Sequence, residues 1–366
     1  MEEAVEFSKL GVLLMNTGTA DEPTVEAVRA YLSEFLMDPA IIGAPRAIRK
    51  QLVRHICKHR PERTVANYEA FWTPEGSPFI LTSREQCTLL AASLTEALGS
   101  PVHVALAMRY GNPGIPAGLR ELRDAGCDGV VVLPCYPQQV SVCAGTCLKA
   151  ANAEFERLRA DGWQAESVDI FNFYEQPAYR RALVDRVAAS WTYTPGAKLV
   201  VSFHSTLMAD IEAGDPYRDQ AEATRDFLAE GLGIPAEDVV LSYQSRFDNR
   251  KWLQPFTAPT VLELAAQGVR DICVVCPIFT ATNLETAIEV DRDLRKTFLD
   301  AAGEGATFTY VPELNTDAGL IEALTAEVLS ALADPQDYRQ FPDPGQDTSL
   351  PGMLHPSASF AGKRCK

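Results

Sequence analysis

Short apolar runs rich in Val, Leu and Ile recur along the chain, and each is followed by a longer segment with helical patterning. They lie at residues 11–16, 102–108, 129–134, 198–204, 238–244 and 271–277. Runs of this length without polar alternation are typical of parallel strands that are buried on both faces. Strands that alternate with helical segments indicate βαβ units. The sequence therefore predicts an α/β protein.

The two halves of the chain resemble each other. Residues 119–138 and 261–280 both read as a helix, a Gly, a strand and a Pro before a loop, and both 11–19 and 199–206 read as a strand ending in small polar residues. This similarity predicts two related doubly wound, Rossmann-like domains with parallel sheets, which we place at 1–150 and 151–333. Ligands of such domains bind at the carboxyl ends of the strands. Residues 334–366 are rich in Pro, Gly and Ser and are expected to form a mobile tail.

The charge of the chain limits its partners. A net charge of −16 and a pI near 4.8 argue against nucleic acid as a partner, although a local basic patch can still serve an anionic ligand. The acidic start differs from a secretory signal, and no apolar run reaches the ~20 residues that span a bilayer. Nine Cys indicate reduced thiols or metal ligands rather than disulfides. We expect a cytoplasmic protein, and leave open peripheral membrane contact and the choice between monomer and homodimer.

A row of acids follows the last predicted strand. Glu285, Glu289 and Asp293 recur every four residues, so on a helix they would share one side and repel one another. Such a row is most often a solvated face, and a lone His such as His204 is most often structural. However, His204 ends the predicted strand 198–204. If the two strands are neighbours, an imidazole would face carboxylates, a combination that can remove protons and hold a divalent cation.

Several segments, in order, carry a resemblance to a known family. They include "FWTPEGSPF", "AMRYGNP", "LPCYPQ", "VSFHS", "LSYQSRFDNRKWLQP", "CPIFTATNLETAIEVD" and "PELN". On these segments the chain resembles the ferrochelatases, which insert ferrous iron into a porphyrin to make heme, over roughly residues 8 to 330. The resemblance implies a chelatase-like fold and a metal-inserting lyase with Fe²⁺ and a porphyrin as substrates. We favour protoporphyrin IX over coproporphyrin as that porphyrin.

The resemblance also implies roles for individual residues. It makes His204 the active-site imidazole and Glu285 the carboxylate facing it, with Glu289 and Asp293 on an iron path. Carboxylates in a row can pass a cation without exposing it to apolar surroundings. The residues that match porphyrin-binding positions are Thr17, Arg63, Tyr68, Ser77, Arg109, Tyr110, Tyr136 and Gln138. Arg63 would suit a propionate, and Arg109 either binds the ligand or anchors a strand end.

Four clustered cysteines form a second candidate site. Cys127, Cys135, Cys143 and Cys147 lie close in the sequence, and four thiolates suit a structural zinc or an iron–sulfur cluster. Some ferrochelatases carry a [2Fe–2S] cluster, so the resemblance offers one for these four residues. The alternative is that they are buried thiols without a metal, with Cys135 simply ending a strand. The sequence leaves both readings open.

The chain also departs from the family pattern. Ser205, Thr206 and Leu207 follow His204, where Gly, an apolar residue and Pro are usual, and Thr282 stands where Asp is common. These changes bear on rate and metal preference. Two other functions stay open on the sequence: a chelatase for another divalent metal, and a non-catalytic protein that binds tetrapyrrole or senses redox state through an iron–sulfur cluster.

Overall fold

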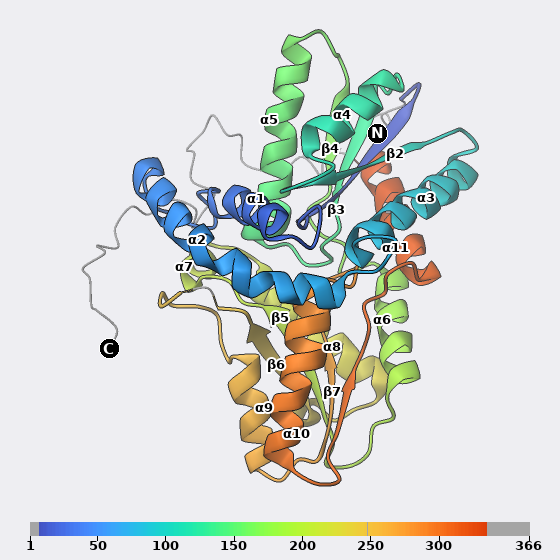
Figure 1. Ribbon diagram of the computed structural model, residues 1–366. Helices are drawn as coiled ribbons and strands as arrows, with labels where there is room; N and C mark the ends of the chain where they lie inside the picture. Colours follow the sequence, from blue (N-terminus) through green and yellow to red (C-terminus); the bar gives the residue numbers. More distant parts are fainter. Residues whose placement is uncertain (1–6, 247, 335–366) are drawn as a thin grey trace.

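The computed structural model describes residues 7–246 and 248–334, which form two four-stranded sheets. The first contains β1 (Leu10–Asn16), β2 (His103–Met108), β3 (Gly129–Pro134) and β4 (Glu166–Asp169) in the order β2-β1-β3-β4, and the second contains β5 (Lys198–His204), β6 (Val239–Gln244), β7 (Asp271–Val275) and β8 (Thr307–Tyr310) in the order β6-β5-β7-β8. Every strand pair is parallel. The predicted α/β class and the two related doubly wound sheets are confirmed (Figure 1).

Helices cover both faces of the sheets. Before β5 the helices are α1 (Val25–Leu36), α2 (Arg46–Phe71), α3 (Pro78–Leu98), α4 (Ile115–Asp124), the π-helix η1 (Ser141–Gly145), α5 (Thr146–Ala160) and α6 (Pro177–Ser190). After it come α7 (Met208–Glu212), α8 (Tyr217–Leu232), the 3-10 helix η2 (Ala236–Asp238), α9 (Thr257–Ala266), the π-helix η3 (Glu285–Leu294), α10 (Arg295–Ala302) and α11 (Ala318–Ala333). No helix in the described part of the chain is long and apolar enough to cross a membrane.

The centre of each sheet is the densest part of the core. Every residue of β1 is buried, and Val130 to Leu133 of β3 are completely inaccessible to solvent. The helix pair α4 and α5 packs on one face of the first sheet, and α3 and α11 pack on the other. Because α11 also packs against α6, the last described helix ties the two domains together.

The path of the chain between the domains differs from the prediction. The predicted boundary between residues 150 and 151 lies inside α5, and β4 beyond it pairs with β3 of the first sheet. The chain therefore passes to the second domain only after Asp169. The strands β4 and β8 were not predicted, because each has only four residues and includes polar ones. Apart from Asp334, the tail predicted to be mobile lies outside the described residues.

Candidate active site

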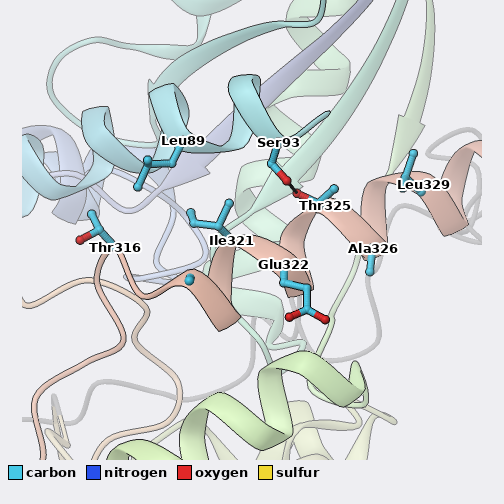
Figure 2. Close-up of a pocket in the computed structure, with 9 residues that line it drawn as sticks. Leu89, Ser93, Thr316, Ile321, Glu322, Thr325, Ala326 and Leu329 are labelled. Atoms are coloured by element: carbon cyan, nitrogen blue, oxygen red, sulfur yellow. Dashed lines mark hydrogen bonds between the residues drawn. The ribbon is translucent and has the colours of Figure 1, made fainter. Parts of the chain in front are cut away.

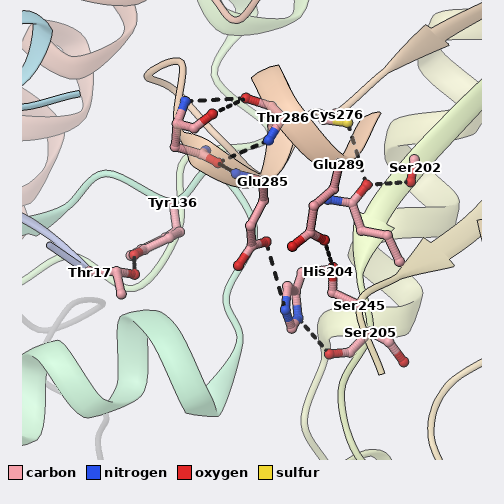
Figure 3. Close-up of polar contacts among 12 residues, drawn as sticks. Thr17, Tyr136, Ser202, His204, Ser205, Ser245, Cys276, Glu285, Thr286 and Glu289 are labelled. Carbon is pink, nitrogen blue, oxygen red and sulfur yellow. Dashed lines mark hydrogen bonds and ion pairs between the residues drawn. The ribbon is translucent and has the colours of Figure 1, made fainter. Parts of the chain in front are cut away.

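The predicted imidazole and its facing carboxylate come together at the carboxyl ends of neighbouring strands. β5 ends at His204 and pairs directly with β7, which leads through a loop to η3 and its first residue, Glu285. The Nε2 atom of His204 lies 3.8 Å from Oε2 of Glu285 (Figure 3). This separation is longer than a hydrogen bond but short enough for an ion pair once the imidazole is protonated.

The hydrogen bonds of His204 define which ring nitrogen is the base. Nδ1 lies 2.7 Å from the backbone carbonyl oxygen of Ser205, and a carbonyl can only accept, so Nδ1 carries the proton of the neutral ring. Nε2 is then left with its lone pair pointing toward Glu285. The backbone carbonyl of His204 accepts from the Tyr217 hydroxyl at 2.9 Å, which fixes the end of β5. The imidazole is therefore oriented as a base.

The row of acids lies on a π-helix rather than on the α-helix assumed from the spacing. η3 contains Glu285, Glu289 and Asp293, and π-helices occur mostly as short segments at functional sites. Glu289 accepts a hydrogen bond from Ser245 at 3.0 Å. Asp293 lies further out and accepts from the Nε atom of Arg292 at 2.7 Å, so the outer acid already has a cation beside it.

The charge of Glu289 is disfavoured where it lies. Desolvation by the surrounding protein and the nearby Glu285 raise the pKa of its carboxyl, and the Ser245 hydrogen bond acts in the opposite direction. Ser245 follows β6 and has φ of 63°, a backbone conformation that is uncommon for residues other than Gly. A strained residue thus presents its hydroxyl to the second acid of the row. A divalent cation beside Glu285 and Glu289 would relieve their repulsion.

A network of polar side chains around the buried Glu313 holds the loop before η3. The amide nitrogen of Thr282 donates to Oδ1 of Asn315 at 2.8 Å, and the Thr282 hydroxyl donates to Oε2 of Glu313 at 2.8 Å. The Tyr310 hydroxyl makes a short contact with the same carboxyl group. Burial raises the pKa of Glu313, and the hydroxyls around it oppose that shift. This network fixes the residues that lead into Glu285.

Some of the predicted porphyrin-binding residues gather beside these acids. The hydroxyl groups of Thr17 and Tyr136 are in direct contact near Glu285 (Figure 3). Tyr68 of α2 is close enough to Glu285 that the carboxylate charge adds to the effect of burial in raising the pKa of the phenol. Burial and the nearby Glu285 charge also raise the pKa of Tyr31, which lies on α1. We did not predict Tyr31 from the sequence, because nothing in the pattern of α1 separates it from ordinary core residues.

The structure gives other predicted residues bonding partners within the protein. Arg109 forms an ion pair with Asp38, which also accepts a hydrogen bond from the Tyr110 hydroxyl at 2.9 Å. This contact favours the anchoring alternative for Arg109. Gln138 is fully buried, and its amide donates to Thr224 of α8 at 3.0 Å, so it joins the two domains.

The remaining two predicted ligand residues are Ser77 and Arg63. Ser77 is buried just before α3, and its hydroxyl has no hydrogen-bond partner within the described protein. Arg63 lies on α2 with its side chain exposed to solvent. The roles of both as porphyrin ligands stay predictions.

The four clustered cysteines do not fit a shared metal cluster. Cys127 precedes β3 and Cys135 follows it, so the length of a whole strand, on the order of 20 Å, separates their backbones. Within the described ranges, no three or more His, Cys, Asp or Glu side chains are arranged to hold a metal ion. Burial raises the pKa of Cys135 and of Cys147 to about 12. Cys127, Cys135 and Cys147 are buried and Cys143 is partly buried.

A separate hollow lies between α3 and α11 (Figure 2), with a volume of about 470 Å³. Its walls are mainly apolar and include Leu89, Ile321 and Leu329. Glu322 is its one ionisable lining residue. It therefore lacks the imidazole and the paired carboxylates found beside η3, and it is not the candidate active site.

Two parallel-sheet domains whose strand ends bring an imidazole against a row of carboxylates define a chelatase-like protein. SirB from Bacillus subtilis, solved with Fe³⁺, has the same fold with a TM-score of 0.52, at 11% identity over 90% of this chain and 98% of that one. A cobalt complex of the sirohydrochlorin chelatase SirB from Bacillus subtilis subspecies spizizenii has a TM-score of 0.51, at 11% identity with the same coverage. At this identity the likeness concerns the fold.

Closer relatives define the family. The family model described as Ferrochelatase matches residues 9–332. A ferrochelatase of Bordetella pertussis is 40% identical over 319 residues, which cover 87% of this chain and 86% of that one. A ferrochelatase of Thioalkalivibrio sulfidiphilus is 39% identical over 322 residues, with 87% and 86% coverage. The chain belongs to the ferrochelatase family.

Proposed function

We propose that this protein is a cytoplasmic enzyme that inserts ferrous iron into a free-base porphyrin, with protoporphyrin IX as the preferred substrate. The observation that carries the proposal is Nε2 of His204 facing Glu285 at 3.8 Å while Nδ1 lies against the Ser205 carbonyl. A free-base porphyrin has two inner N–H groups that must lose their protons before a metal can enter the ring plane. The site offers a neutral base and an adjacent carboxylate for this step.

The order of events follows from the positions of these side chains. His204 accepts the first pyrrole proton at Nε2 and the adjacent Glu285 carboxylate accepts the second, so both protons have an acceptor before the metal enters the ring. Fe²⁺ reaches the ring by way of Asp293 and Glu289, exchanging one carboxylate oxygen for the next. Because the iron is a substrate that must leave its protein ligands, a row of passing ligands serves better than a closed site with three or four ligands.

The porphyrin is proposed to lie against the side chains around Glu285. Thr17, Tyr136 and Tyr68 come from three separate segments of the first domain, and a flat macrocycle needs contacts of this kind on more than one side. Walls that fit a puckered ring better than a flat one would turn a nitrogen lone pair toward the metal and favour release of the flatter product.

Steady-state metalloporphyrin formation tests the proposal. Purified protein is supplied with Fe²⁺ and either protoporphyrin or coproporphyrin, and we expect faster turnover with protoporphyrin. Equal loss of both activities in a Tyr68→Phe variant would show that Tyr68 does not distinguish the two substrates. If Co²⁺ or Zn²⁺ is inserted efficiently while Fe²⁺ is not, the metal assignment is wrong although the chemistry of insertion is right.

A further inference from the structure

One buried acid near the site has no part in the proposed reaction. Glu313 follows β8 and is only 5% exposed. No Lys, Arg or His in the described ranges forms an ion pair with it. Burying a carboxyl group without a cation is costly unless hydrogen bonds satisfy its oxygens. The groups that bond to Glu313 therefore indicate its role.

Hydroxyl groups satisfy both oxygens of this carboxyl group. Oε2 accepts from the Thr282 hydroxyl at 2.8 Å, and Oε1 accepts from the Tyr310 hydroxyl. Burial raises the pKa of Glu313, and hydrogen bonds from Tyr310, Thr282 and Thr286 oppose that shift. Thr282 precedes Glu285 by three residues and Thr286 follows it directly. Glu313 therefore contacts the chain on either side of the carboxylate that faces His204.

The position of Glu313 bears on the departure from the family pattern at 282. Asp is common there, whereas this chain has Thr282, whose hydroxyl donates to Glu313. A carboxyl group is thus retained within hydrogen-bonding distance of the side chain at 282, but it comes from the segment after β8. Two carboxylates at this place would repel each other. Thr at 282 and Glu at 313 are therefore a matched pair.

The loop between β7 and η3 is also held from the first domain. Asn315, with φ of 53°, accepts from the backbone nitrogen of Thr282 at 2.8 Å through its side chain. Its own backbone carbonyl accepts from the buried Gln86 of α3 at 2.7 Å. The Thr280 hydroxyl donates to the carbonyl of Cys135 at 3.2 Å. The same loop that contacts Glu313 is therefore fixed relative to both domains.

This loop determines where Glu285 points. Oδ1 of Asn283 accepts from the backbone nitrogens of Glu285 at 2.9 Å and of Thr286 at 3.2 Å, which satisfies the start of η3. Oε2 of Glu285 is buried and has no hydrogen-bond partner within the described residues. Because no hydrogen bond holds that oxygen, the backbone beneath it directs Glu285 toward His204 (Figure 3).

We propose that Glu313 is a positioning residue of the active site. Its carboxyl group replaces, from the segment after β8, the one that is common at position 282 in the family, and it holds the loop that presents Glu285 to His204. The inference rests on the proposed function where turnover is measured. Two further measurements use no substrate.

Exchange of the two residues tests whether they form a matched pair. The variants Thr282→Asp and Glu313→Ser should each lower the midpoint of urea denaturation. The double variant Thr282→Asp/Glu313→Ser again has one carboxyl group at this place, so its midpoint should lie above those of both single variants. Additive losses would show that the two positions are independent.

Turnover tests the effect on the site. Glu313→Ser should lower kcat about ten- to a hundredfold, as expected when a reacting group is displaced, and should change the KM for porphyrin less than about twofold. The double variant should recover most of the lost kcat. Glu327→Ser is the matched control, because Glu327 of α11 is 6% exposed and accepts a hydrogen bond from Gln176. The control should keep the wild-type kcat even where it loses stability.

Nuclear magnetic resonance of the histidine rings reports on the site without substrate. In protein labelled with ¹⁵N-histidine, His204→Ala identifies the ring signals of His204. These signals should move in Glu313→Ser although Glu313 does not touch His204, and they should return toward their original positions in the double variant. Glu327→Ser should leave them unchanged.

Three outcomes would overturn the inference. They are an unchanged kcat in Glu313→Ser, a kcat that the double variant does not recover, and ring signals of His204 that stay in place in Glu313→Ser. If wild-type protein forms no iron porphyrin, the proposed function fails instead. The denaturation and resonance measurements would still decide whether Glu313 holds Glu285 against His204.

Discussion

At the scale of single residues, the site combines groups that stabilise the fold poorly. Glu289 lies beside Glu285 and in surroundings that disfavour its charge, and Ser245 holds it from a strained backbone. Such arrangements persist when they are useful in function. Removing the charge of Glu289 should therefore raise the free energy of unfolding.

Glu289→Gln should make the protein more stable at neutral pH and less able to use iron. The pKa of Glu289 is raised in the folded protein, so folding favours its protonated form, and this contribution is lost as pH rises from about 4.5 through the raised value. Urea denaturation between about pH 5 and pH 8 should show a shallower decline for the variant than for the wild type. Its apparent iron requirement should rise more than its porphyrin requirement. An equal rise in both would argue against an iron path.

Thr282 stands where Asp is common in the family, and a stability measurement can also test what this difference does. Thr282 donates to the buried Glu313, so Thr282→Asp would place a second carboxyl group against one whose charge is already disfavoured. We expect a loss of about 1–3 kcal/mol in unfolding free energy at neutral pH, with a smaller loss at low pH. Thr282→Ser keeps the hydroxyl and is the control. A variant as stable as the wild type would show that Glu313 does not depend on this donor.

Among the helices and strands, the sequence predicts the apolar strands that are buried in the core. It misses the short edge strands, which backbone pairing defines. The six predicted strands are apolar, and five of them match the observed strands to within one residue at each end, because burial on both faces requires such residues. The sixth, predicted at 271–277, ends two residues earlier at Val275. β4 has the sequence ESVD and β8 has TFTY, and as edge strands they have one neighbour each. Backbone pairing rather than apolar patterning defines them.

The two π-helices could not be predicted either. The spacing of Glu285 and Glu289 suits an α-helix as well as a π-helix, and only the hydrogen-bonding pattern separates them. The pairing of His204 with Glu285 was predicted on the condition that their strands are neighbours and from the resemblance to the ferrochelatases, and β5 does pair with β7. The partners of Arg109 and Gln138 lie on helices whose positions the sequence does not give.

The central strand β1 should be sensitive to the loss of packing. Leu13 is completely buried and packs against Gly118 of α4. Leu13→Ala should lower the unfolding free energy by about 2–5 kcal/mol, because the cavity cannot collapse in a sheet that is covered on both faces. Val104→Ala on the neighbouring strand β2, where the side chain is half-buried, should cost less. Similar losses in both variants, measured by urea denaturation, would contradict the location of the core.

At the scale of the whole molecule, the two domains are joined by polar contacts beside the site. Asp215, which follows α7, accepts from the backbone nitrogen of Ser141 in η1 at 2.8 Å, and Gln220 of α8 accepts from the backbone nitrogen of Gln139 at 2.7 Å. Cys143, two residues after Ser141 and near Asp215, therefore lies at the domain junction.

The iron content of the purified protein tests whether the four clustered cysteines bind an iron–sulfur cluster. Protein purified without oxygen from iron-replete cells should be colourless and show no charge-transfer bands, because Cys127 and Cys135 lie at opposite ends of β3. Cys127→Ser should leave the absorption spectrum unchanged. Visible bands with about two irons per chain, lost in Cys143→Ser and Cys147→Ser, would return the cluster to this protein.

The proposed reaction depends most on the base at the end of β5. The decisive measurement is steady-state formation of iron porphyrin by wild-type protein and by His204→Ala, with porphyrin binding measured in parallel by fluorescence. We predict that His204→Ala binds porphyrin but forms product about a hundred- to ten-thousandfold more slowly, as expected for loss of a general base. Equal rates for the two proteins, or equal inactivity with porphyrin still bound, would contradict it.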